Sequence, residues 1–326
     1  MRALVVADRE LVVEERPDPV PQPGEVLVRV LAAGLNRADL AQRAGFYPAP
    51  PGSPADIPGL EFAGEVAVLG DGVDSLSIDD RVFGLVGGGG QAEFVTVPAA
   101  HCVPVPESLD IVEAGAVPEV FITAHDAMVT QAELRKGETL LVHAAGSGVG
   151  TAAVQLGHAM GCKVVGTSRT ADKLRQCHAL GLDHAVVAPR ELDPVALAES
   201  ITADAGPVDV VVDLVGGAYV VTDVRAAARL GRIVLVASQA GARADLEIGA
   251  VMSKRLRIHG TVLRARTTEE KTAATDAFAR DVLPLLADGT VRPVVAKTFP
   301  LEAATDAYET LAADAVFGNI VLDLRG

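Results

Sequence analysis

The segment 138–168, ETLLVHAAGSGVGTAAVQLGHAMGCKVVGTS, contains an apolar run, a glycine cluster, a stretch of helical length and a second apolar run. This order predicts a strand, a tight turn, a helix and a second strand. In such a unit the backbone N–H groups of the turn and the N-terminus of the helix face a pyrophosphate, so the segment predicts a dinucleotide site. Gly146, Gly148 and Gly150 are expected to let the backbone turn tightly and approach the ligand closely.

The glycine spacing departs from the strict dinucleotide pattern G-x-G-x-x-G. Gly146 and Gly148 begin that pattern, but Thr151 stands where its last glycine belongs. Read one residue earlier, small residues keep the same spacing and end at Gly150. A glycine cluster alone is weak evidence, so the β-α-β context carries the prediction. The expected cofactor contacts in the turn are Ala145, Gly146, Ser147, Gly148, Val149 and Gly150.

The residues after the second strand favour NADP(H) over NAD(H). An NAD site ends this strand with an acidic residue that binds the ribose 2′-hydroxyl, about 20 residues past the glycines. Here Ser168 and Arg169 end the strand, and Lys173 lies one turn into the next predicted helix. Hydroxyl groups and cations can bind a 2′-phosphate, which a carboxylate would repel. The alternative is that Arg169 and Lys173 are solvated surface charges.

Length, charge and cysteine content limit the possible functions. A chain of 326 residues is long for a single core, so we expect two domains. The formal net charge of −15 argues against nucleic acid or an anionic membrane as the main partner. Three scattered cysteines suit a reducing cytoplasm and offer no zinc cluster. Thr139–Cys162 lacks charged side chains, yet its glycines and polar residues favour a buried strand and helix over a membrane span.

The pattern of elements changes along the chain. Up to about residue 120 it is rich in valine, proline and glycine, with strand-like runs at 26–31, 65–69 and 93–97, which predicts a small β-rich domain. From there strands alternate with helices, which predicts a doubly wound parallel sheet. Its expected strands are 139–143, 163–167, 184–188, 208–213 and 232–237, with 257–262 at one edge. A tail with a helix at 268–287, a strand at 294–299, a helix at 301–313 and a strand at 319–324 is expected to return to the first domain.

Six segments follow one another in an order that suggests a family: 34–48 (GLNRADLAQRAGFYP), 58–66 (PGLEFAGEV), 87–98, 117–124, the glycine turn and 260–266 (GTVLRAR). Together they resemble the quinone oxidoreductase (zeta-crystallin-like) branch of the medium-chain dehydrogenase/reductase superfamily, and most closely its tumour-suppressor-inducible type. The resemblance implies a Rossmann dinucleotide-binding domain at 121–262. It also implies a GroES-like β-rich substrate domain made of residues 1–120 and 263–326.

The resemblance is to members that work without zinc. Zinc-dependent members have a cysteine at the position of Asn36 and a histidine at that of Leu60, and they carry a cysteine-rich lobe that this chain lacks. Catalytic zinc needs three protein ligands, so no metal site is expected. His143, beside the glycine turn, is expected to be a packed strand residue rather than a ligand or catalyst.

The resemblance places Asn36 and Tyr47 in the nicotinamide and substrate cleft as catalytic residues. Without zinc, hydrogen-bond donors must polarise the substrate carbonyl. Position alone instead favours a turn residue at Asn36 and loop packing at Tyr47, and Glu61 fits a structural role as well as a functional one. The cofactor contacts implied outside the turn are Thr123, Ser168, Arg169, Lys173, Gly216, Tyr219, Ser238, Arg264 and Asn319.

Two positions depart from the family pattern. Ala188 stands where a tyrosine often lies near the 2′-phosphate, and Asn319 replaces a basic residue before the last strand. Both departures weaken the transfer of individual phosphate contacts to this chain. They leave the expectation of NADPH itself in place.

The expected activity is reduction of quinones by hydride transfer from NADPH, on a small-molecule substrate. The same fold also reduces activated C=C bonds in enones, enals or enoyl thioesters, and this alternative stays open. Zeta-crystallin relatives can further serve as lens proteins or RNA-binding proteins that hold NADPH, but the acidic charge argues against RNA. The family default is a homodimer, with the strand at 257–262 as the expected contact.

Overall fold

The computed structural model describes residues 1–326, and the chain forms two compact units. Unit 1 contains Met1–Ile122 and Leu263–Gly326, and unit 2 contains Thr123–Val262. Residues 263–326 therefore belong to the same compact unit as the first 122 residues. The substrate-binding and cofactor-binding roles expected of the two parts stay predictions. No helix combines the length and the apolar character that crossing a membrane requires.

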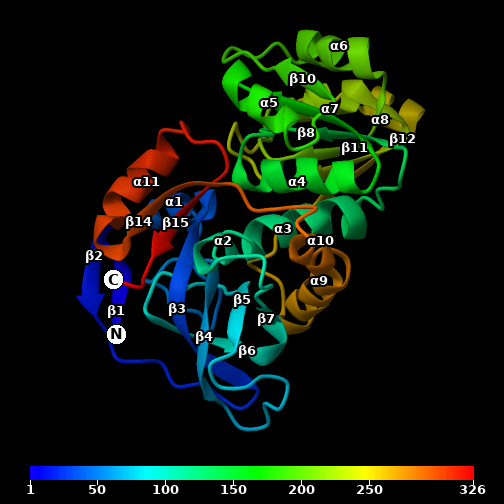
Figure 1. Ribbon diagram of the computed structural model, residues 1–326. Helices are drawn as coiled ribbons and strands as arrows, with labels where there is room; N and C mark the ends of the chain where they lie inside the picture. The colour runs from blue at the N-terminus through cyan, green and yellow to red at the C-terminus, as the bar shows by residue number, and fades with distance from the viewer. The chain divides into compact units, whose positions relative to one another are not determined.

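Unit 2 is built on a six-stranded parallel sheet with the strand order β10-β9-β8-β11-β12-β13 (Figure 1). From β8 the chain winds outward to β10, then returns to β11 on the other side of β8. This topology confirms the predicted doubly wound parallel sheet. Its strands are β8 (Thr139–Val142), β9 (Lys163–Ser168), β10 (His184–Val187), β11 (Val208–Asp213), β12 (Ala227–Leu235) and the edge strand β13 (Arg257–Gly260). Its helices are α4 (Gly148–Ala159), α5 (Ala171–His178), α6 (Pro194–Ala205), α7 (Tyr219–Ala226) and α8 (Ile248–Lys254), preceded by the π-helix η2 (Asp126–Gln131).

Helices pack on both faces of this sheet because successive strand residues point to opposite sides. Leu141 of β8 shares one core with Leu197 and Ile201 of α6. Leu140 belongs to the other face, where Gly157 of α4 lies against it. A Cβ atom on Gly157 would come within 2.7 Å of a Leu140 methyl carbon, so the glycine lets α4 lie close to the sheet.

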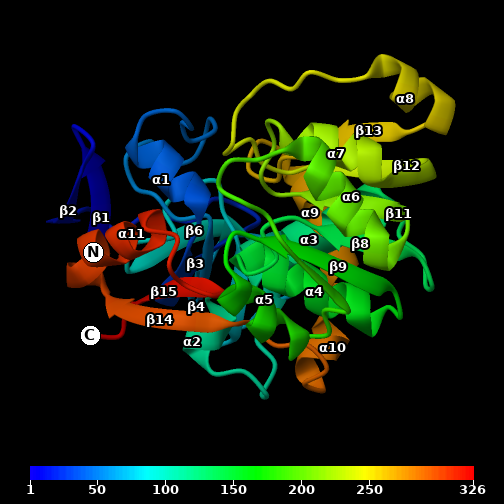
Figure 2. The same cartoon turned by 90° about the horizontal axis from the view of Figure 1, so that it is seen from above.

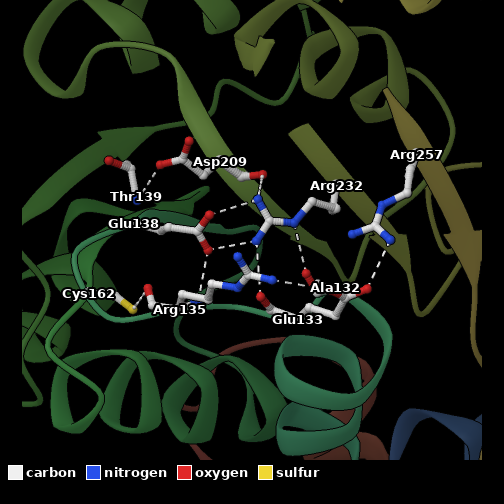
Figure 3. A network of polar contacts seen from close by, with 9 residues as sticks. All are labelled: Ala132, Glu133, Arg135, Glu138, Thr139, Cys162, Asp209, Arg232 and Arg257. Carbon is white, nitrogen blue, oxygen red and sulfur yellow. Dashed lines mark hydrogen bonds and ion pairs between the residues drawn. The ribbon is translucent and has the colours of Figure 1, made fainter. Parts of the chain in front are cut away.

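A polar network joins the strands of this sheet at the end where β8 and β11 begin (Figure 3). Arg232 of β12 donates to the two carboxylate oxygens of Glu138 at 2.9 and 2.6 Å, and to the carbonyl oxygen of Ala132 at 2.8 Å. Asp209 accepts a hydrogen bond from the backbone N–H of Thr139 at 2.8 Å. The network lies at the start of β8, and the glycine turn follows the end of the same strand.

Unit 1 contains a two-stranded hairpin and a seven-stranded sheet with the path β14-β15-β3-β4-β5-β7, in which β6 also pairs with β3 (Figure 1). Figure 2 shows β14 and β15 beside β3 from above. All neighbours are antiparallel except β14 and β15. The strands are β1 (Arg2–Ala7), β2 (Glu10–Glu15), β3 (Glu25–Leu35), β4 (Glu61–Leu69), β5 (Arg81–Leu85), β6 (Phe94–Pro98), β7 (Cys102–Pro104), β14 (Val295–Pro300) and β15 (Asn319–Asp323). The helices are α1 (Arg37–Arg43), α2 (Ile111–Ala114), α9 (Thr268–Asp281), α10 (Leu283–Ala287) and α11 (Ala304–Ala312), with the short 3₁₀ helices η1 (Ala99–His101) and η3 (Leu301–Ala303). The helix α3 (Pro118–His125) begins in unit 1 and ends in unit 2.

Several predicted elements are wrong in their bounds. The run expected at 65–69 is the end of β4, which begins at Glu61, and β3 extends to Leu35 rather than to residue 31. The helix expected at 301–313 begins as the 3₁₀ helix η3 and becomes α-helical at Ala304. Two further differences have a clear physical reason. The single helix expected at 268–287 is two helices, because α9 ends at Asp281 and α10 begins at Leu283. Pro284 lacks a backbone N–H and its ring clashes with the preceding turn, so it interrupts the helix. The strand expected at 232–237 begins earlier, at Ala227. Its first residues include the exposed Leu230 with a left-handed φ of 67°, and they lack the apolar run that marks a buried strand.

Candidate functional site

The glycine turn between β8 and α4 has a different backbone from the one expected. Ala144 carries the left-handed φ of 50°, and none of Gly146, Gly148 and Gly150 does. The glycines therefore do not supply the left-handed turn. Gly150 is required by close packing instead, since a Cβ there would lie 2.4 Å from the carbonyl oxygen of Ala144. A Cβ on Gly146 would lie 2.8 Å from the Cβ of Lys173.

The turn fits the pyrophosphate of a dinucleotide. Ser147 caps α4 and accepts a hydrogen bond from the backbone N–H of Gly150 at 3.2 Å. The first turn of α4 holds no acidic residue, so its N–H groups and the positive end of its dipole suit an anion. The predicted contacts Ala145 and Val149 lie in the same turn and first helical residues.

The predicted 2′-phosphate residues lie beside this turn. Ser168 is the last residue of β9, next to Thr167, whose carbonyl oxygen accepts from the N–H of Ala145 at 2.9 Å. The stem of Lys173 packs against Gly146. Arg169 is exposed at the end of β9. The backbone N–H of Ala188 donates to the carbonyl oxygen of Ser168 at 2.9 Å, so the family departure at Ala188 also borders this place.

A second loop of unit 2 gathers three more predicted contacts. Gly216 has a left-handed φ of 71°, and a Cβ on it would lie 2.8 Å from the Cα of Ser238. The N–H of Gly216 donates to the carboxylate of Asp213 at 2.8 Å, which fixes this loop at the end of β11. Tyr219 follows at the start of α7. Thr123 is buried in α3 and forms no hydrogen bond with any of these residues.

His143 is fully buried, as the sequence predicts, but it belongs to a polar cluster. Its Nδ1 lies 2.7 Å from the hydroxyl of Thr167, and its Nε2 lies 2.7 Å from a carboxyl oxygen of Asp223. Burial lowers the pKa of His143 to about 4. Burial raises the pKa of Asp213 to about 6 and that of Asp223 well above its usual value. The ring of Tyr219 packs edge-on against His143, with centroids 4.9 Å apart.

In unit 1, Asn36 stands between β3 and α1 and is held from two sides. Its backbone N–H donates to the carboxylate of Asp39 at 2.8 Å. Its side-chain Nδ2 donates to Oε1 of Glu61, the first residue of β4, at 2.7 Å. The other oxygen of Glu61 accepts from the backbone N–H of Glu119 at 2.8 Å. The half-buried amide of Asn36 is thus fixed by a carboxyl group that is itself only 1% exposed.

Arg264 organises the loop that carries Tyr47. Its guanidinium donates to the carbonyl oxygens of Gly87 and Tyr47 at 2.8 and 2.9 Å, and to the side chain of Gln42 at 2.6 Å. The guanidinium carbon lies 5.0 Å from the centroid of the Tyr47 ring. Arg264 is 4% exposed, so the structure gives it a loop-holding role. Its expected cofactor contact stays a prediction.

The sequence did not predict that three acidic residues of unit 1, Asp39, Glu61 and Glu119, are buried or half-buried. Burial raises the pKa of Asp39 to about 6, that of Glu61 to about 8 and that of Glu119 to about 7. Asp39 also accepts from the backbone N–H of Gly59 at 3.1 Å. A carboxylate within the apolar sequence PGLEFAGEV could have signalled this, since a buried charge needs partners. The partners themselves lie too far away along the chain to be identified.

Asn319 lies in β15 of unit 1, with its side-chain nitrogen buried and without a hydrogen-bond partner. It is the only predicted cofactor contact with such an atom. A buried donor without a partner costs free energy, so it has capacity for an acceptor. No group of three or more His, Cys, Asp or Glu side chains in the structure is arranged to hold a metal ion.

Both parts of the chain match known protein families. Residues 148–280 match the family described as zinc-binding dehydrogenase, and residues 22–107 match the alcohol dehydrogenase GroES-like domain. A quinone oxidoreductase from Rattus norvegicus is 32% identical over 296 residues, covering 90% of this chain and 87% of that protein. The chain belongs to the medium-chain dehydrogenase/reductase superfamily.

Solved structures of this superfamily agree over the whole chain. The quinone oxidoreductase from Thermus thermophilus, solved also in complex with NADPH, is 32% identical with a TM-score of 0.83 and covers 99% of this chain and 100% of its own. The CurK enoyl reductase is 25% identical with a TM-score of 0.84, and the match covers 99% of this chain and 98% of its own. Membership makes this chain an NAD(P)-dependent oxidoreductase that acts on small molecules, with a Rossmann-like sheet and a GroES-like part.

Proposed function

We propose that this medium-chain dehydrogenase/reductase reduces quinones with NADPH and without zinc. The observation that carries the proposal is the amide of Asn36, which Glu61 holds at the position where zinc-dependent members have a cysteine ligand. An amide N–H can polarise a carbonyl oxygen, as zinc does in those members, by a hydrogen bond. The similarity to quinone oxidoreductases over most of the chain supports the substrate class.

The glycine turn and its neighbours would hold NADPH. The N-terminus of α4 suits the pyrophosphate, while Ser168, Arg169 and Lys173 suit the 2′-phosphate. Gly216, Tyr219 and Ser238 form a second group in the same unit that we assign to the rest of the cofactor. When bound, the nicotinamide supplies the hydride.

The residues of unit 1 would position and polarise the substrate. A quinone that accepts a hydride becomes a hydroquinone anion, which is aromatic and stable, so a strong acid is not required. Asn36 would donate to the oxygen on which this charge develops. Tyr47, whose loop Arg264 fixes, would orient the ring of the substrate. Neither residue needs to transfer a proton.

Reduction of activated C=C bonds is the second candidate. The similarity to the CurK enoyl reductase favours it, because that protein shares the fold over the full length of this chain. A donor that stabilises a hydroquinone anion would equally stabilise an enolate. A role as a non-catalytic protein that holds NADPH would leave both substrate classes unreduced, so turnover distinguishes it.

Further parts of the proposal concern assembly and location. We assign a homodimer contact to the edge strand β13, whose backbone groups can pair with a second copy. Three free cysteines are consistent with a reducing cytoplasm. Sedimentation of the purified protein tests the first point.

The deciding experiment measures the oxidation of NADPH and of NADH with a panel of 1,4-benzoquinones, 1,4-naphthoquinones and 2-enones. We expect higher kcat/KM with NADPH and with quinones. Preference for NADH would refute the cofactor assignment, and preference for enones would favour the second candidate. No turnover with any acceptor would favour the non-catalytic alternative.

A further inference from the structure

Glu61 has both carboxyl oxygens engaged as hydrogen-bond acceptors. Oε1 accepts from Nδ2 of Asn36 at 2.7 Å, and Oε2 accepts from the backbone N–H of Glu119 at 2.8 Å. Glu119 lies in the first turn of α3, so the carboxyl group sits at the positive end of that helix. At 1% exposure, Glu61 cannot touch a substrate itself.

The position of this carboxyl group depends on Gly34. A Cβ on Gly34 would lie 2.1 Å from Oε1 of Glu61, inside the space that the oxygen occupies. The backbone of β3 therefore has no side chain at the one place where the carboxyl group must pass to reach Asn36. The backbone of β3 at Gly34 and the first residue of β4 thus fix the contact between Asn36 and Glu61, which involves no mobile surface side chain.

The ionised carboxylate is the strongest acceptor for both donors, because both of its hydrogen bonds are then charge-assisted. A proton leaves each oxygen some acceptor capacity but removes the negative charge that strengthens both bonds. Protonation of Glu61 therefore weakens its hold on the amide of Asn36 and on the N–H of Glu119.

The groups around Glu61 set the pH at which this occurs. Burial, with a smaller contribution from the nearby acids Glu119 and Asp39, outweighs the hydrogen bonds that lower the pKa of Glu61 and raises it to about 8. The pKa values of Glu119 and Asp39 lie lower, at about 7 and about 6. Arg264 acts on both of these acids and Lys271 acts on Glu119. The ionised fraction of Glu61 thus rises with pH near the working range of an oxidoreductase.

We propose that Glu61 is the positioning residue of the active site, whose ionised carboxylate fixes the Asn36 amide in the orientation that presents its second N–H to the substrate carbonyl. This inference rests on the proposed function, because it assumes that Asn36 faces the substrate. It adds a requirement that the proposed function lacks: turnover depends on the protonation state of a residue that never contacts the substrate.

The test is the pH dependence of kcat/KM with NADPH and a 1,4-naphthoquinone that has no ionisable group, from pH 6 to 9.5. For the wild type we expect a rise through a pKa near 8. Glu61→Gln has one oxygen and cannot satisfy both donors, so it should stay flat at the low-pH level, on the order of tenfold below the wild type at pH 9. Glu119→Gln removes an acidic neighbour and should shift the rise to lower pH. Glu65→Gln, an acid on the same strand that pairs with Arg29, is the matched control and should keep the wild-type profile.

A double-mutant cycle then shows whether Glu61 acts through Asn36. We expect Asn36→Ala with Glu61→Gln to be within about twofold of Asn36→Ala alone, because the second change removes an interaction already lost. Multiplied losses, or a Glu61→Gln variant that keeps the pH-dependent rise, would overturn the inference and leave the proposed function standing. Wild-type kcat/KM in Asn36→Ala would refute the role of Asn36 and the inference together. Thermal unfolding of each variant confirms that it is folded.

Discussion

Arg232 offers the sharpest test of what stabilises the parallel sheet of unit 2. Its side chain is 10% exposed and forms a two-pronged pair with Glu138, together with hydrogen bonds to backbone carbonyls (Figure 3). Arg232→Met keeps the length of the side chain but removes the charge and every donor. It leaves a carboxylate and several carbonyl oxygens without their partner.

The expected loss follows from the burial of the groups left behind. Breaking a buried ion pair by removing one partner costs about 3–5 kcal/mol. Glu138 keeps the hydrogen bond from the N–H of Arg135 and is 24% exposed, so water can replace part of the interaction. We therefore expect a loss of about 3 kcal/mol in the free energy of unfolding, at the lower end of that range. This corresponds to a fall of roughly 6–12 °C in Tm.

Arg257→Met is the matched control, because Arg257 pairs with Glu133 at 2.9 Å in the same network, while both side chains are about half exposed. An exposed pair contributes about 0–1 kcal/mol. Thermal and urea unfolding of both variants would give the comparison. Equal losses from the two variants would refute the reasoning from burial, as would a loss under about 1 kcal/mol at Arg232.

The pH dependence supplies a second check on the same pair. Burial alone would raise the pKa of Glu138, but hydrogen bonds from Arg232 and from the N–H of Arg135 outweigh it and lower the pKa. A carboxylate with a lowered folded pKa contributes stability above its unfolded pKa of about 4.3 and loses it as the pH falls through the folded value. The difference between the wild type and Arg232→Met should be constant from pH 6 to 8 and shrink below about pH 4.

Three further outcomes are expected. Arg169→Ala should raise the KM for NADPH at least several-fold and leave that for NADH nearly unchanged, since a charge-assisted phosphate contact contributes about 1.5–3 kcal/mol; equal changes with both cofactors would contradict the assignment. Metal analysis of the purified protein should find well under one zinc per chain, and turnover should survive a chelator; stoichiometric zinc with chelator-sensitive turnover would rule this out. Tyr47→Phe should lower kcat/KM about tenfold or less, and Asn36→Ala should lower it more; wild-type values for both would place the site elsewhere.

The fold could be predicted from the sequence where burial leaves a simple pattern. Parallel strands are covered on both faces, so they appear in the sequence as short apolar runs between helices. The order of these runs predicts the doubly wound sheet. The prediction was wrong where local chemistry overrides the pattern. Pro284 divides a segment whose apolar spacing is helical throughout, and the exposed start of β12 carries no apolar signal.

The glycine turn shows a similar limit. The cluster at 146–150 identified the turn correctly, but the left-handed residue is Ala144. A sequence pattern indicates where small residues are needed, but it does not indicate whether a left-handed φ or a close contact with another atom requires them. At Gly150 the constraint is the carbonyl oxygen of Ala144, and at Gly146 it is the stem of Lys173, a residue 27 positions later whose approach no local pattern reveals.

The burial and the partners of the acidic residues could not be predicted from the sequence, and they come from the structure alone. Asp213 and Asp223 each keep one carboxyl oxygen without a hydrogen-bond partner, and Glu61 and Asp39 are almost fully buried. Burying a carboxyl group is costly when an oxygen lacks a partner, and even a fully paired one often adds no stability over an apolar residue, so a core selected only for stability would replace these residues with apolar ones. They lie instead beside the two places that the family resemblance marks, Asp213 at the loop of Gly216 and Glu61 at Asn36. Polar groups that a fold retains at such cost tend to lie at functional sites. The burial pattern therefore supports both candidate regions on grounds independent of the resemblance that first suggested them.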